Sequence, residues 1–423
     1  MALEQIFTCP RTLSNLRSAP LGGFFDGFCD ALVQEGFSTS TIRKHLSNAA
    51  HLNAYLGAQH YGDKQPLTAQ IICDFLRDYP AQARNRGPID KHVACVRASL
   101  SRLSAYLQKS GHFALPAQPG AEIYQPLLAA YLKWLAEHQH SAPGTVEVRA
   151  HSIRQFLLWL GPKATVQGCS ELTPERVEHF FFTYAKRKGR SAQHSMQAAL
   201  RMFFRFCLQQ GYIRQSLDQA VPALRRYTLS TVVRGLSEEQ SIKLLQCIDR
   251  RRPAGRRDYA ICQLLYTYGV RGGQVRALQF KDIDWVANQV LFRALKHGKD
   301  TLLPLTQEVG VSLLDYLQNA RPCSQDSHLF LTVHAPYQAL KSSSVVSNMI
   351  GHYIRAAGID ITCKGAHVFR HGFATRMLAE GHSLKAIADV LGHRHLGSTL
   401  IYTKVDFKHL KQVALPWPGE VSP

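Results

Sequence analysis

The side chains best suited to phosphate chemistry lie between residues 268 and 405. Arg271 follows a glycine turn and begins a predicted helix, and Lys296 lies at the tip of a predicted hairpin. His367 and Arg370 are three residues apart, so they share one face of a helix, and His371 lies on the same side, four residues after His367. These residue types suit a reaction at a negatively charged centre.

One more segment completes the series. His393 follows Gly392, which is predicted to end a helix, and Tyr402 lies nine residues further on, near the end of the next predicted helix. Each signal is modest by itself, because an arginine beside a turn is most often a surface residue and a lysine at a hairpin tip is most often only solvated. The prediction therefore rests on the combination and its order.

Cleavage of a phosphodiester would use all of these groups. Its transition state concentrates negative charge on the non-bridging oxygens, and planar guanidinium groups, which are always charged, suit that load. Arg271 and Arg370 are therefore assigned to a phosphate clamp. Tyr402 is the candidate nucleophile, and a nearby base or a strong positive field must help it ionise, because a free phenol has a pKa of about 10.

The order Arg, Lys, His-x-x-Arg, Gly-His and Tyr resembles the active site of the tyrosine recombinase (phage integrase) family. The resemblance covers the whole C-terminal part of the chain and is strongest from His367 to Tyr402. It implies that Tyr402 cuts DNA and stays joined to it through a 3′-phosphotyrosyl bond. It also implies that His367 is the base or a further donor to the phosphate, that His393 donates to a phosphate oxygen, and that Lys296 protonates the leaving 5′ oxygen. The covalent bond conserves the energy of the broken phosphodiester, so the expected reaction needs no cofactor, ATP or metal.

One position departs from the family pattern. The family often has a glutamate three residues after the first arginine, where this chain has Gln274. A glutamine still accepts a hydrogen bond but carries no charge, so Gln274 is assigned a supporting role. His371, on the same side of the helix as His367, is assigned a supporting role as well.

The net charge of the chain also predicts a polyanionic partner. The 423 residues contain 50 Lys and Arg against 30 Asp and Glu, a formal charge of +20. Nucleic acid is the commonest such partner, since neutralised phosphates release counterions, and the family resemblance implies that it is double-stranded DNA. The candidate DNA contacts lie in the predicted helical regions and the linker: Thr41, Arg43, Lys44, Thr145, Arg149, Lys186, Arg187, Lys188, Arg190, Arg225 and Arg226.

The first half of the chain contains an internal repeat. A shift of 104 residues aligns Thr41 with Thr145, Tyr55 with Trp159 and Gly57 with Gly161. In each copy a turn precedes an amphipathic helix that a glycine is expected to close. The sequence therefore predicts two copies of one small helical domain, residues 15–115 and 120–225, both similar to the family's core-binding domain, which is usually present once.

A catalytic domain is predicted to follow these copies. Residues 226–235 form a basic linker, and Ser237 with Gln240 predicts a capping box at the start of a new domain, 236–412, before a tail at 413–423. Helices are predicted near 237–249, 256–269, 272–280, 307–320, 343–357, 367–380, 383–391 and 396–402, with a hairpin at 289–305. The fold class is therefore mainly α with a small β-sheet in the catalytic domain.

Composition indicates where such a protein works. The ten cysteines include no C-x-x-C pair, and neither a signal peptide nor an apolar run long enough for a membrane span is evident. The expected location is the cytoplasm of a prokaryote, on the nucleoid, with reduced cysteines. The resemblance implies a homotetramer on two DNA sites, with accessory or partner recombinases, serving a mobile element in integration, excision or transposition.

Three alternatives remain open at this stage. His367, His371, His393 and His395 could bind a metal, although Val368 stands where an H-E-x-x-H motif needs a glutamate; retained activity in a chelator would distinguish the two. A DNA-binding relative without catalysis is disfavoured because every chemical position is filled. A type IB topoisomerase-like activity would use related chemistry, and the paired helical domains favour recombination over it.

Overall fold

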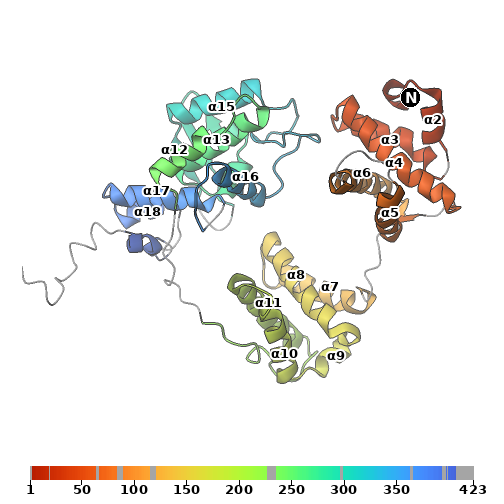
Figure 1. Cartoon of the computed structure of the whole chain (residues 1–423). Helices are drawn as coiled ribbons and strands as arrows, with labels where there is room; N and C mark the ends of the chain where they lie inside the picture. The colour runs from red at the N-terminus through yellow and green to blue at the C-terminus, as the bar shows by residue number, and fades with distance from the viewer. Residues whose placement is uncertain are drawn as a thin grey trace, which may run out of the picture. The chain divides into compact units, whose positions relative to one another are not determined.

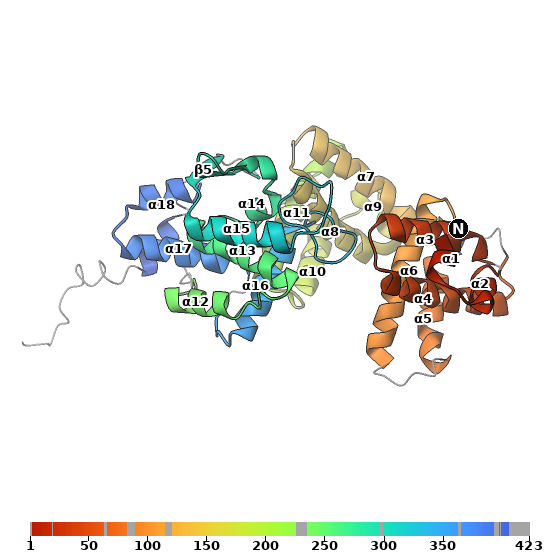
Figure 2. The ribbon, with the colours of Figure 1, turned by 90° about the horizontal axis from the view of Figure 1, so that it is seen from above.

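The computed structural model describes residues 2–18, 20–62, 66–82, 89–114, 121–225, 235–295, 299–362, 365–392, 397 and 399–405. Contacts between residues divide the chain into two units, one made of residues 1–58 and 228–423 and the other of residues 59–227. In the described ranges we find no helix that is both long and apolar enough to cross a membrane. Figures 1 and 2 show the chain from two directions.

Residues 2–58 form four helices: α1 (Ala2–Ile6), α2 (Pro10–Leu16), α3 (Gly22–Gln34) and α4 (Thr39–Ala58). Helices α3 and α4 pack against each other through buried Phe25, Phe28, Leu46 and Leu52. The buried Asn53 side chain on α4 accepts a hydrogen bond from the Leu21 N–H at 2.8 Å, which ties the start of α3 to α4.

The unit of residues 59–227 contains seven helices and two short parallel strands among its described residues. They are β1 (Leu67–Thr68), α5 (Ala69–Gln82), α6 (Ile89–Lys109), β2 (Phe113–Ala114), α7 (Ala121–Glu137), α8 (Pro143–Leu160), α9 (Val166–Ser170), α10 (Pro174–Ala185) and α11 (Arg190–Gln209). Helix α8 packs against both α7 and α11. An aromatic core joins them, with the rings of Tyr131 and Phe203 edge to face at 5.3 Å and Phe156 fully buried.

The helices of the two predicted copies follow the same order. Helices α4, α5 and α6 correspond to α8, α10 and α11 along the chain, and α3 corresponds to α7. Gly111 and Gly211 both have positive φ, at +75° and +72°, directly after α6 and α11. The pairing of Gly57 with Gly161 was wrong as a helix-closing signal, because Gly57 lies inside α4 whereas Gly161 ends α8 with φ +60°. The corresponding order supports duplication, and the domain boundaries stay a prediction.

Residues 235–405 are mostly helical and include a three-stranded antiparallel sheet. The elements are α12 (Glu238–Gln246), α13 (Pro253–Tyr268), α14 (Gly272–Ala277), β3 (Ile283–Asp284), β4 (Gln289–Phe292), β5 (Thr301–Pro304), α15 (Gln307–Asn319), α16 (Ser343–Ala356), α17 (His367–Ala379), α18 (Leu384–Val390) and the 3₁₀ segment η4 (Leu400–Val405). The strand order is β3-β4-β5. Helix α13 is central, since it packs against α12, α14, α15, α16 and α17 (Figure 1). This arrangement confirms a mainly helical fold with a small sheet.

Local signals predicted most of these elements. The capping box is present, with Ser237 Oγ accepting from the Gln240 N–H and the Gln240 side chain accepting from the Ser237 N–H, both at 3.1 Å. The predicted hairpin is confirmed by the pairing of Val290 with Leu303. The last predicted helix, 396–402, is different: its described end is the 3₁₀ segment η4 rather than an α-helix.

Candidate active site

The described catalytic candidates come from the ends of α13, α17 and η4. Helix α13 ends at Gly269, whose φ of +59° is left-handed, and a Cβ atom there would lie 2.6 Å from a ring carbon of Phe373 on α17. Glycine thus lets the chain turn closely against α17. Two residues later Arg271 occupies the N-cap position of α14, with an exposed side chain.

Arg370 is the buried centre of this region. Its side chain lies on α17 and the residue is 3% exposed. Nη1 donates to the Gly269 carbonyl oxygen at 3.0 Å, and Nη2 donates to the Leu391 carbonyl oxygen at 2.7 Å. One guanidinium therefore joins the end of α13 to the end of α18, and it satisfies two carbonyls that the helix ends leave open.

Tyr402 lies beside α17 with its ring buried. The residue is 1% exposed and packs in an apolar cluster with Ala374, Leu378, Ile387 and Leu391, supplied by α17 and α18 and the residue after α18. Its hydroxyl lies 3.0 Å from His371 Nδ1. The apolar cluster holds the ring, and the histidine holds the oxygen that is to react.

The surroundings shift the proton affinities of these groups. Burial raises the pKa of Tyr402, while the positive charges of Arg370 and Arg271 oppose that rise. The pKa of His371 is lowered to about 4, mainly by burial and further by the charges of His367 and Arg370, so its ring is neutral at pH 7. Partial desolvation, followed by Arg370 and Arg271, also lowers the pKa of His367. Burial and Arg271 lower the pKa of Arg370 to about 10, which leaves it charged at pH 7.

Gln274 supports Arg271 through the backbone. Its side-chain oxygen accepts from the Arg271 N–H at 3.1 Å, and its Nε2 donates to the Arg293 carbonyl at 3.4 Å. The side chain therefore caps the start of α14 and links it to the segment after β4. A neutral amide performs this bridging with both a donor and an acceptor, whereas a carboxylate would have acceptors alone.

Lys296 and His393 lie outside the described residues, but their described neighbours border the site. A Cβ atom on Gly273 would lie 2.7 Å from Leu295, and one on Gly392 would lie 3.6 Å from the Thr301 hydroxyl. The arms of the hairpin thus reach both the start of α14 and the end of α18. The structure therefore brings together Arg271, Gln274, His367, Arg370, His371 and Tyr402.

The contact between His371 and Tyr402 is the feature of this site that the sequence did not predict. The His371 and Tyr402 ring centroids are 5.7 Å apart, and those of His367 and His371 are 6.1 Å apart. The available signal was that His371 follows His367 by four residues, which puts it on the same side of α17. Among the described residues no three His, Cys, Asp or Glu side chains gather as a metal site would require.

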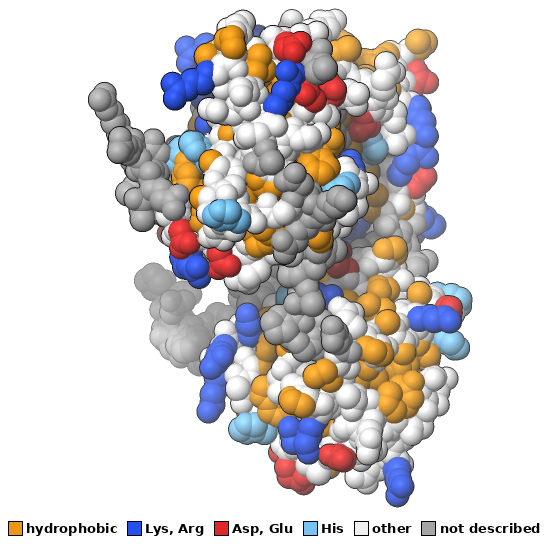
Figure 3. All heavy atoms as spheres, turned by 90° about the vertical axis from the view of Figure 1, so that its right-hand side faces the viewer, with side chains coloured by type: hydrophobic (Ala, Val, Ile, Leu, Met, Phe, Trp, Pro, Cys, Tyr) orange, Lys and Arg blue, Asp and Glu red, His pale blue; other side chains and the backbone are white. Residues whose placement is uncertain are grey.

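The candidate DNA contacts are distributed over several helices and the loops beside them. Lys44, Lys186, Arg187, Lys188, Arg190 and Arg225 are exposed, whereas Arg226 lies outside the described residues. Thr41 and Thr145 are half-buried near the starts of α4 and α8. Two arginines already have partners, since Arg43 Nε donates to the Ile6 carbonyl at 2.8 Å and Arg149 Nη1 to the Ser141 hydroxyl at 3.1 Å. On the face in Figure 3, Lys and Arg side chains are scattered among neutral and hydrophobic ones.

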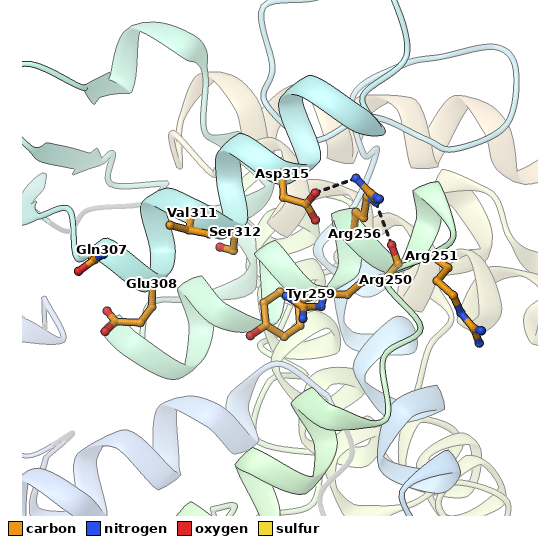
Figure 4. Close-up of a pocket in the computed structure, with 9 residues that line it drawn as sticks. All are labelled: Arg250, Arg251, Arg256, Tyr259, Gln307, Glu308, Val311, Ser312 and Asp315. Atoms are coloured by element: carbon orange, nitrogen blue, oxygen red, sulfur yellow. Dashed lines mark hydrogen bonds and ion pairs between the residues drawn. The ribbon is translucent and has the colours of Figure 1, made fainter.

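Three arginines of another basic segment, residues 250–257, have partners within the protein. Arg256 pairs with Asp315 at 2.7 Å and Arg257 pairs with Asp258, while Arg250 lies over the Tyr259 ring at 4.7 Å. Figure 4 shows Arg250, Arg256, Tyr259 and Asp315 at a cavity of about 990 Å³ between α15 and the start of α13. None of the catalytic candidates lines this cavity.

Comparison with known proteins identifies the family. The Phage integrase family model matches residues 234–409. A Sinorhizobium fredii protein that bears the name integrase/recombinase y4rF is 30% identical over 422 residues, covering 99% of this chain and 96% of its own. Tyrosine recombinase XerA of Pyrococcus furiosus is 31% identical over 265 residues, covering 62% of this chain and 86% of its own. The chain belongs to the phage integrase family: it is a tyrosine recombinase, an enzyme that acts on DNA by cleaving and rejoining it.

Solved structures show the same fold. XerH site-specific recombinase bound to a palindromic difH substrate aligns with a TM-score of 0.54 and 18% identity, covering 84% of this chain and 99% of that chain. A lambda integrase dimer bound to a COC′ core site aligns with a TM-score of 0.52 and 17% identity, covering 66% and 94%.

We predict that Arg370 is required for stability as well as chemistry. In Arg370→Ala the Gly269 and Leu391 carbonyls lose their donors, at a cost of about 1–3 kcal/mol for each buried group. Arg370→Lys should recover only part of the lost stability, because a single ammonium cannot span both carbonyls as the guanidinium fork does. Denaturant unfolding measures the change, with exposed Arg355→Ala as a control expected to stay within about 0.5 kcal/mol. An Arg370→Ala protein as stable as wild type would contradict the structural role.

Proposed function

We propose that this recombinase cleaves one DNA strand with Tyr402, holds it as a 3′-phosphotyrosyl intermediate and rejoins it to a partner strand. The observation that carries the proposal is a tyrosine hydroxyl held 3.0 Å from His371, the residue that follows the buried, cationic Arg370 on α17. A nucleophile beside an always-charged guanidinium suits attack on a phosphodiester.

The two arginines would stabilise the phosphate as it becomes pentavalent. Arg271 is exposed at the start of α14 and Arg370 lies beneath it, fixed by two carbonyls. Pre-set donors are worth most where charge develops, because they need no reorganisation during the reaction. Burial raises the pKa of Tyr402 and the charges of both arginines oppose that rise, so the charges that hold the phosphate also favour the phenolate.

The remaining roles follow the family pattern. Lys296 would protonate the leaving 5′ oxygen, and His393 would donate to a phosphate oxygen. His367 keeps an exposed edge at the start of α17, which suits a donor to the phosphate. Neither ATP nor a metal is part of this scheme, since the phosphotyrosyl bond retains the energy used to rejoin the strand.

Recombination for a mobile element is the biological role we propose. The support is the near full-length likeness to the S. fredii integrase/recombinase y4rF. XerH and lambda integrase, which share the fold, were solved on recombination-site DNA. A homotetramer that synapses two such sites, working in the prokaryotic cytoplasm with or without accessory recombinases, completes the proposal.

The first test is formation of a covalent adduct. Nicked duplex DNA from the ends of the element that carries the gene is incubated with wild type and with Tyr402→Phe, and denaturing gels show protein joined to DNA. We expect the adduct with wild type and none with Tyr402→Phe, while both shift the DNA in native gels. DNA binding without an adduct from wild type would instead indicate a binding protein of this fold.

The two helical copies are proposed to contact DNA together with the catalytic domain. If the first copy binds DNA, a protein that lacks residues 1–115 should protect a shorter stretch of the site from nuclease digestion. The exposed Lys44 on α4 is one candidate contact. An unchanged footprint would assign the first copy to protein contacts instead.

The end of the chain is proposed to dock on a neighbouring protomer. The segment from Val405 to Val413 has the apolar spacing of an amphipathic segment and lies largely outside the described residues. A chain that ends at residue 404 should still bind one site but fail to join two sites in a native gel. Normal synapsis by this shortened protein would contradict the docking role.

A further inference from the structure

We propose that His371, rather than His367, accepts the Tyr402 proton when the tyrosine attacks the phosphate and returns it on religation; this rests on the proposed function. His371 Nδ1 lies 3.0 Å from the Tyr402 hydroxyl, which is hydrogen-bonding distance for direct transfer. For His367 the structure records a ring contact with His371, at 6.1 Å between centroids, and no hydrogen bond to Tyr402.

Packing fixes this pair from both sides. His371 lies in the first turns of α17, directly after Arg370, whose guanidinium is tied to two helix ends. The Tyr402 ring is held in its apolar cluster with Leu378 and Leu391. The Tyr402 ring cannot turn away without breaking this buried packing, and the half-buried His371 follows the anchored Arg370 on α17, so the fold brings the two groups to their 3.0 Å contact.

The proton and electron balance is complete. The Tyr402 O–H bond breaks and its proton goes to His371 Nδ1, while the phenolic oxygen forms a bond to phosphorus. The bond from phosphorus to the 5′ oxygen then breaks, and that oxygen takes a proton from the acid assigned to Lys296. On religation the 5′ hydroxyl returns its proton to Lys296 and its oxygen bonds to phosphorus. The bond from phosphorus to the Tyr402 oxygen breaks, and that oxygen regains its proton from His371.

The same geometry explains why the nucleophile would be idle without DNA. In the free protein His371 is a weak base, since burial, His367 and Arg370 all lower its pKa. A phosphate bound between Arg271 and Arg370 would offset the charge of Arg370, so the basicity of His371 would rise when the substrate is in place. Proton acceptance would thereby be coupled to DNA binding.

The test compares His371→Ala with His371→Gln in single-turnover adduct formation on the nicked duplex. A proton acceptor predicts that both variants are slowed by a similar factor, about 10²–10⁴-fold, because glutamine can hydrogen-bond to the phenol but cannot take its proton. His382→Ala, an exposed histidine after α17, is the matched control and should cleave at the wild-type rate. Native gel shifts and melting curves confirm that each variant folds and binds DNA. Wild-type cleavage by His371→Gln would overturn the proposal and leave a positioning role.

A second measurement changes the acidity of the nucleophile. Tyr402 is replaced by a fluorinated tyrosine, whose phenol loses its proton more readily, in wild-type and His371→Ala backgrounds. We expect His371→Ala with the fluorinated tyrosine to form the adduct at least about tenfold faster than His371→Ala with ordinary tyrosine. Absence of any recovery in a folded, DNA-binding protein would show that the loss is structural.

A third measurement separates base from acid. In a substrate with sulfur in place of the bridging 5′ oxygen, the leaving group needs no proton. We expect this substrate to rescue Lys296→Ala but not His371→Ala; rescue of His371→Ala would move His371 to the acid step. Wild-type adduct formation and its loss in Tyr402→Phe report on the proposed function separately, so that function stands or fails independently of His371.

Discussion

The site depends on one buried charge, the guanidinium of Arg370. Removing a cation from water is costly unless the protein supplies hydrogen-bond acceptors, and here two carbonyls at helix ends do so, from Gly269 and Leu391. The consequence is architectural: the turn that presents Arg271, the end of α18 and the helix that carries His371 all meet at one group. The positive field that a phosphodiester needs is thus provided by the same residue that holds the site together.

The second constraint is that the reacting oxygen is buried. Tyr402 is 1% exposed, and burial raises the pKa of its phenol while the arginines oppose that rise. A nucleophile in this position is protected from water and needs an internal proton acceptor, and the structure puts a neutral imidazole beside it. The geometry therefore favours a proton acceptor inside the protein over a base that arrives from solvent.

The helical half of the chain contains none of the candidate catalytic residues, which all lie after residue 268. Helices follow the same order in both predicted copies, and each copy has a glycine with positive φ after its last long helix. The alignment with the S. fredii relative covers 99% of this chain and so extends over both predicted copies, whereas the alignment with XerA covers 62% of this chain and 86% of XerA. The duplication itself stays a prediction.

The sequence by itself determined the family, the order of the candidate catalytic residues and most helix boundaries after residue 236, because these depend on residues close together along the chain. The capping box at Ser237 and the turn at Gly269 are such signals. The role of Gln274 in capping Arg271 became clear from its hydrogen bonds, although the substitution itself was visible in the sequence. The tertiary structure alone decided that Arg370 bridges Gly269 and Leu391, 101 and 21 residues away, and that His371 meets Tyr402, 31 residues away. Helical periodicity shows which face of α17 is buried, but the partner on that face is chosen by packing between distant elements, which no local pattern records.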